Sequence, residues 1–159
     1  MKFTFKKGKH SPREWWQMRG LQFSNSMSYK VRFDKSCRYD KLSIERDINK
    51  LFGFSWNTFD HHDNSVRFGW RYNNILGKIE IFKYCYKNGV RVATWLKAID
   101  LNQTIELKLQ VSGTICYFVI GNSFIDSIDM EQNFNYGVKL RPYFGGNTPA
   151  PHTMTLRLD

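Results

Sequence analysis

Apolar and polar residues alternate along several stretches of this 159-residue chain, and this pattern restricts its fold more than any other feature. Between Val66 and Tyr72 every second residue is aromatic or β-branched, and the residues between them are arginine or glycine. Met1–Lys7 and Tyr29–Phe33 alternate in the same way. Successive side chains of a β-strand point to opposite faces, so these stretches are predicted to be half-buried strands.

Turn residues predict two β-hairpins. The first joins Lys78–Tyr86 to Val90–Trp95 through Asn88-Gly89, a pair suited to a type I′ turn because both central residues need a positive φ. The second turns at Ser112-Gly113. The same reasoning predicts strands in and after this second hairpin: Thr104–Val111, Thr114–Ile120, Tyr136–Tyr143 and Thr153–Leu158.

Only Asp40–Leu51 favours a helix, because its apolar residues recur at three- and four-residue spacing and Ser43 suits an N-cap. Eight or more short strands in a chain of this length predict an all-β fold, a single β-sandwich of jelly-roll type with at most one short helix. We expect one domain over residues 1–159, in which residues 1–25 form a basic arm or the first strand.

The net charge of +10 lies mostly in the first third of the chain. Residues 1–50 hold 13 Lys and Arg against 5 Asp and Glu, and the rest of the chain is close to neutral. Such a segment favours an acidic partner, which could be nucleic acid, an acidic protein surface or an anionic glycan. The alternative is a solvated face that only aids solubility. No nucleic-acid-binding motif accompanies the charge, so any contact with nucleic acid would be nonspecific.

Two adjacent tryptophans lie within this basic segment. A strand cannot turn both of them toward one core, so an arm that docks on another protein subunit is predicted. Its partner-binding residues would be Lys6, Lys7, Lys9, Arg13, Trp15 and Trp16.

The three cysteines show neither a disulfide framework nor metal-ligand spacing, so buried free thiols are expected. Met1–Lys7 is basic but no apolar segment follows it, as a secretory signal would require. The sequence also has no apolar run long enough to span a membrane. We therefore expect a protein made in the cytoplasm without a signal peptide.

One acidic strand invites comparison with glycoside hydrolases. Ser127, Asp129 and Glu131 would share a strand face, and jelly-roll glycosidases carry a Glu-x-Asp-x-Glu strand there. Serine cannot replace the carboxylate that forms the glycosyl intermediate. We therefore predict that the protein is not an enzyme, and we assign no catalytic residue.

Asp60-His61-His62-Asp63 is the other polar cluster. Adjacent histidines on a strand point apart, and no second Cys or His cluster has ligand spacing, so a polar turn is expected and no metal site. No phosphate-binding glycine motif is present, so no cofactor is predicted.

Aromatic rows allow two interpretations. Phe68, Trp70 and Tyr72 share one strand face, and Phe82, Tyr84 and Tyr86 share another. Such rows are usually core, but exposed ones can stack on sugar rings. The residues that would bind a glycan in the second case are Trp70, Tyr84, Tyr86, Asp129 and Glu131.

Two stretches resemble small concanavalin A-like jelly-roll proteins of gut Bacteroidetes and their tailed phages: His61–Tyr72 followed by Gly77–Tyr84, and Leu140–His152. The resemblance covers residues 40–159. It implies a lectin-like sandwich and carries no catalytic set. The glycine pair and prolines of the second stretch would form a stiff loop, either a structural corner or the rim of a groove.

Together these observations favour a non-catalytic structural, decoration or attachment protein of a phage particle. It would be oligomeric and held to a partner subunit by its basic N-terminal third. The alternative is a lectin-like carbohydrate-binding module, and a glycoside-cleaving enzyme ranks third.

Overall fold

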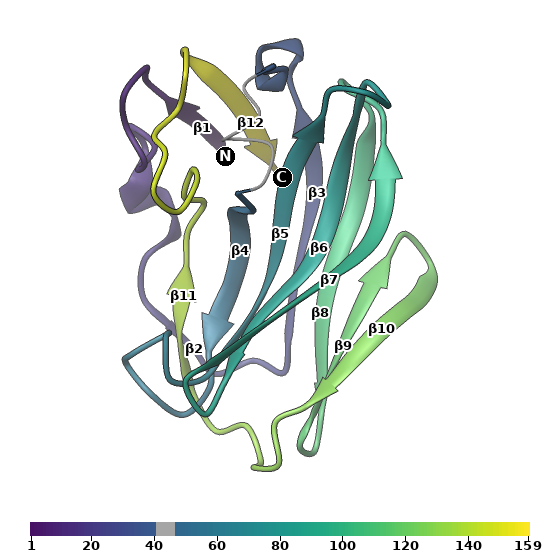
Figure 1. Cartoon of the computed structure of the whole chain (residues 1–159). Coiled ribbons are helices and arrows are strands. Elements are labelled where there is room, and N and C mark those ends of the chain that lie inside the picture. Colours follow the sequence, from purple (N-terminus) through teal and green to yellow (C-terminus); the bar gives the residue numbers. More distant parts are fainter. Residues whose placement is uncertain (41–46) are drawn as a thin grey trace.

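Two antiparallel six-stranded sheets pack face to face in the computed structural model, which describes residues 1–40 and 47–159 (Figure 1). We call them the back sheet, of order β1-β12-β3-β8-β9-β10, and the front sheet, of order β2-β11-β4-β5-β6-β7. The back strands are β1 (Lys2–Phe5), β3 (Ser26–Phe33), β8 (Thr104–Ser112), β9 (Ile115–Ile120), β10 (Ser123–Asp129) and β12 (Met154–Leu158). The front strands are β2 (Leu21–Gln22), β4 (Asn49–Ser55), β5 (Ser65–Asn73), β6 (Lys78–Lys87), β7 (Val90–Ile99) and β11 (Gly137–Leu140).

Aromatic side chains fill the space between the sheets. Phe68 of β5 lies against Phe118 of β9, with ring centroids 5.1 Å apart. Trp70 of β5 lies 4.9 Å from Phe33 of β3. All four side chains are fully buried, and each buried aromatic hides about 150–250 Å². The alternation in β5 is therefore confirmed. One face of the strand lies in the core, and the other face belongs to the outer surface of the front sheet.

The predicted sandwich and its hairpins are confirmed. At the β6–β7 turn Asn88 and Gly89 have φ of 50° and 77°, as a type I′ turn requires. The helix predicted over Asp40–Leu51 is wrong where the structure describes it, because residues 49–51 begin β4 and residues 41–46 lie outside the described residues. A bulge between Lys50 and Gly53 interrupts the alternation in β4, and this irregular spacing imitates a helical period.

The N-terminal segment belongs to the domain. β1 pairs with β12, and Phe3 and Phe5 are fully buried in the core. After β1 the chain is held by backbone bonds from Gly8 to Ala150 and from Arg13 to Thr4. Within residues 1–25 the structure has a strand at Lys2–Phe5. The described helical segments are the 3₁₀ turns η1 (Trp15–Met18) and η2 (Lys35–Cys37), and neither is long enough to cross a membrane.

The cysteines lie where the sequence predicts. Cys37, Cys85 and Cys116 are buried and free, and burial raises the pKa of each thiol. They are therefore structural residues that stay protonated at neutral pH.

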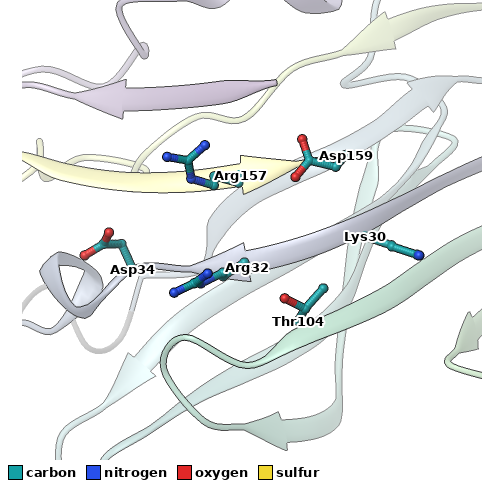
Figure 2. A pocket seen from close by; sticks show the side chains of 6 residues that line it. All are labelled: Lys30, Arg32, Asp34, Thr104, Arg157 and Asp159. Atoms are coloured by element: carbon teal, nitrogen blue, oxygen red, sulfur yellow. The ribbon is translucent and has the colours of Figure 1, made fainter.

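The outer face of the back sheet carries a row of like charges. Lys2, Arg157 and Arg32 lie directly opposite one another on β1, β12 and β3, and Arg157 and Arg32 border a shallow hollow of about 390 Å³ (Figure 2). None of the three forms an ion pair with another described residue. Two acidic side chains, Asp34 and Asp159, line the same hollow, so it is not uniformly basic.

We expect Arg157→Glu to raise the free energy of unfolding by about 0.2–1 kcal/mol, because it replaces two cross-strand repulsions with attractions. Urea unfolding at low salt measures the change. Arg157→Gln is the control, which removes only the repulsion and should gain less. A loss of stability in Arg157→Glu would show that the row does not repel itself.

Candidate functional site

A cleft of about 730 Å³ lies on the outer face of the front sheet. Val66, Phe68 and Cys85 turn toward the core, so the residues that alternate with them on β5 and β6 turn outward. The loop after β11 forms the rim. The side chains central to the chemistry of the cleft are Lys50, His61, Arg67, Tyr84, Tyr86, Arg91 and Arg141.

Arg67 is the most buried charge in the cleft, with 5% of its surface exposed. Burial lowers the pKa of its guanidinium to about 9, so it remains a cation at neutral pH. Its Nη2 donates to the carbonyl oxygen of Arg141 at 2.7 Å, and its buried Nε has no hydrogen-bond partner among the described residues. No described carboxylate pairs with it. A buried cation without an anion is costly, and no carboxylate among the described residues offsets the charge of Arg67.

Arg141, on the loop after β11, adds a second guanidinium to the cleft. Its Nε is also buried, with no hydrogen-bond partner in the part of the chain that the structure describes. The Trp15 ring supports it from behind, with the Arg141 Cζ atom 5.3 Å from the ring centroid and Arg19 on the same ring at 4.8 Å. Trp15 therefore positions a residue of the cleft, although the sequence suggested that it docks on another subunit.

Lys50 brings a third cation from the bulged part of β4. Its Nζ donates to the carbonyl oxygen of Gly145 at 2.9 Å and lies 5.0 Å above the Tyr84 ring. Burial, together with the charges of Arg67 and Arg91, lowers the pKa of Lys50 to about 8. Gly145 has φ of 67°, which glycine adopts easily, and its N–H donates to Asn49 at 2.6 Å. The glycine loop is thus both a corner tied to β4 and the rim of the cleft.

Aromatic rings form the wall beside these cations. Tyr84 and Tyr86 of β6 lie 6.1 Å apart in an edge-to-face arrangement, and Phe59 is 73% exposed at the border of the cleft. Burial and the neighbouring charges of His62 and Arg67 lower the pKa of His61 to about 4, so its imidazole is neutral at pH 7. Asp47 is the one carboxylate among the described residues that line the cleft. Tyr84 is 4% exposed and lies under Lys50, so the accessible rings of this wall are those of Tyr86 and Phe59. The cleft therefore combines positive charge with two rings able to stack on a sugar.

The predicted glycan-binding residues separate into three groups. Tyr84 and Tyr86 line the cleft. Trp70 is fully buried in the core, because alternation in β5 turns it toward the back sheet, so it cannot touch a ligand there. Asp129 ends β10 on the back sheet, and Glu131 follows it with φ of 59° and pairs with Lys87 at 3.0 Å. The strand face that the glycosidase comparison assumed does not reach Glu131.

The predicted arm residues are also dispersed. Trp15 and Trp16 belong to η1, with Trp16 54% exposed. Lys6, Lys7, Lys9 and Arg13 are exposed along the segment that follows β1. These side chains lie on the surface of a segment that backbone hydrogen bonds attach to the rest of the domain.

Sequence reasoning missed Lys50, Arg67, Arg91 and Arg141 as residues of one site. Arg67 carried a usable signal, because it alternates with core residues on a strand and must face outward. Nothing in the sequence showed that the loop around Arg141 returns to this strand, since 74 residues separate the two.

The comparisons place this fold among known proteins. No protein-family model and no curated protein matches the chain. Its structure is similar to that of an alginate lyase from Klebsiella pneumoniae, with a TM-score of 0.63 and 10% identity over 84% of this chain and 58% of the lyase. It is also similar to a GH16 protein of the mixed-linkage glucan PUL of Bacteroides ovatus, with a TM-score of 0.60 and 8% identity over 99% of this chain and 77% of that one.

A Crh5 transglycosylase in complex with NAG is a third neighbour, with a TM-score of 0.60 and 8% identity over 99% of this chain and 69% of the other. These likenesses show that the fold is a concanavalin A-like jelly roll. The resemblance to proteins of gut Bacteroidetes and phages in particular stays a prediction. The prediction that the chain is not an enzyme is contradicted, because solved enzymes share its fold at TM-scores of 0.60 and 0.63.

Proposed function

We propose that the cleft on the front sheet binds an acidic polysaccharide, in which carboxylates accept hydrogen bonds from the arginines and sugar rings rest against Tyr86 and Phe59. The observation that carries this proposal is Arg67, a buried cation with unused donors and no carboxylate partner among the described residues. Arginine suits this task because its planar fork matches a carboxylate.

The shape and the neighbours of the chain support a polymer rather than a small anion. The cleft is large enough for more than one sugar, since ligand sites for drug-sized molecules run from about 300 to 1,000 Å³. A solved neighbour is an alginate lyase by name, and alginate is a polymer of carboxylate sugars. Neutral glucan has no group to offset the charge of Arg67, so it should bind poorly.

A panel of polymers tests the proposal. Affinity electrophoresis of the intact chain, in buffer with a chelator, compares alginate and polygalacturonate with a neutral mixed-linkage glucan. We expect retardation by the acidic polymers alone. Equal retardation by the neutral glucan would refute the role of charge, and no retardation by any polymer would refute the function. The same incubations are followed for shortening of the polymer, because enzymes share this fold.

Lys50 gives the binding a pH dependence. Its pKa of about 8 means that it loses charge as pH rises from about 7 to about 9, so affinity for an acidic polymer should fall across that range. Lys50→Met should flatten this profile, and an unchanged slope would remove Lys50 from the site.

The free energy of unfolding should show the opposite trend with pH. The folded pKa lies below the ordinary 10.5, so the unfolded chain holds more protons between about 8 and 10.5, and stability rises with pH there.

The interpretation as a structural protein of a phage particle rests on a free N-terminal arm. The geometry favours glycan binding over that interpretation, because β1 is a strand of the sandwich and Trp15 supports the cleft. Glycan binding would suit a phage attachment protein as well as a free carbohydrate-binding module.

A further inference from the structure

The turn between β4 and β5 brings together three potential metal ligands. One ligand atom from each of Asp60, His61 and His62 lies within 4.8 Å of the other two. The rings of the two histidines face one another, with centroids 4.1 Å apart and planes inclined by 37°. The sequence predicted that these rings would point apart, which holds for a strand. Here they lie in a turn closed by the Asp63 N–H to the Asp60 carbonyl, so alternation does not apply.

Two contacts hold this cluster at the border of the cleft. The His62 N–H donates to the Asp60 carboxylate at 2.9 Å, and the His62 ring lies edge-on to Tyr86 with centroids 5.2 Å apart. His61 and His62 both line the cleft, so a bound sugar would pass next to them.

We propose that Asp60, His61 and His62 bind one divalent transition-metal ion of the zinc type at the border of the cleft. Two imidazole nitrogens and one carboxylate oxygen form a ligand set that zinc prefers and that calcium and magnesium, which take oxygen ligands, do not. Three protein ligands leave the fourth tetrahedral position open to water or to an oxygen of a ligand in the cleft.

The geometry requires only a small adjustment. Zinc bonds of about 2.0–2.2 Å place tetrahedral ligand atoms on the order of 3.3 Å apart, so separations of up to 4.8 Å must close by at most about 1.5 Å. Asp60 and His62 have side chains that are 60% and 64% exposed, and such side chains rotate freely. Asp60 also offsets the positive charge that Arg67 and Arg141 exert on His61.

Calorimetric titration of the untagged full chain with zinc chloride tests the inference, without any glycan present. We expect one zinc per chain and a loss of affinity of at least about tenfold in His61→Ala, His62→Ala and Asp60→Asn, a loss that even an outer partner of a metal site can carry. Asp63→Asn is the matched control, since it makes the same charge change in the same turn and should bind zinc as the wild type does. Cobalt(II) should give the visible spectrum of a tetrahedral site, and calcium should not bind.

Unchanged zinc affinity in His61→Ala or His62→Ala would overturn the assignment, and so would an equal loss in Asp63→Asn. Far-ultraviolet circular dichroism of each variant shows that the sandwich is intact. Glycan binding is measured with a chelator present, so a failure there leaves the zinc result unaffected, and the reverse also holds.

Discussion

Trp70→Ala is expected to lower the free energy of unfolding by about 3–5 kcal/mol, the usual loss when a large aromatic side chain is removed from a core. Trp70 is fully buried, and its ring packs against Phe33, Tyr39 and Phe144. The back sheet cannot collapse into the space that the indole leaves, so the lost contacts are not recovered. Thermal unfolding should show a drop in Tm on the order of 10 °C.

Trp70→Phe is the matched variant. It keeps most of the aromatic volume and removes an indole N–H that no described residue accepts, so it should cost clearly less stability than the alanine variant. Glycan binding by folded Trp70→Phe should equal that of the wild type. A Trp70→Ala variant that kept its stability and lost glycan binding would mean that the residue faces a ligand, as the sequence had suggested.

Arg67→Met is expected to weaken binding of an acidic oligosaccharide by about 30-fold or more, the loss that follows when one partner of a desolvated charge pair is removed. Its stability should be unchanged or higher than that of the wild type. Arg67 is 5% exposed and pairs with no described carboxylate, and apolar residues of similar size often replace buried charges without loss of stability. Isothermal titration and urea unfolding measure the two effects separately.

Arg32→Met on the outer face of the back sheet is the control. It makes the same substitution and the same change in net charge, but it lies on the sheet opposite the cleft. Equal weakening in both variants would show that the polymer responds only to net charge. A large loss of stability in Arg67→Met would show instead that Arg67 serves the fold.

The sandwich was predictable because alternation and turn residues act locally. β5, β6 and their neighbours follow from period-two patterns, and the Asn88-Gly89 turn from the φ that glycine and asparagine tolerate. β4 was misjudged because its bulge breaks that period between Lys50 and Gly53. The first strand was left open because basic residues after Phe5 conceal how well Phe3 and Phe5 fit the core.

The site was only partly predictable, because it depends on contacts between distant parts of the chain. Tyr84 and Tyr86 were identified from their strand, since aromatic rows on one face are visible in the sequence. Arg67 lies opposite Tyr84 on the neighbouring strand, but Arg141 reaches them only because the loop after β11 returns to this sheet, and Trp15 contacts the Arg141 guanidinium. Such contacts set the pKa of Lys50 and the burial of Arg67, and no local pattern encodes them.

The central claim is that the guanidinium of Arg67 meets the carboxylate of an acidic sugar. Nitrogen-15 NMR of the arginine Nε–H groups follows this contact directly, with the Arg67 and Arg32 signals assigned by their absence in the two methionine variants. On addition of an acidic oligosaccharide we expect a saturable shift of the Arg67 signal and none of the Arg32 signal. A saturable shift of Arg32 with an unchanged Arg67 would contradict the account, because the polymer would then bind the back sheet and not the cleft.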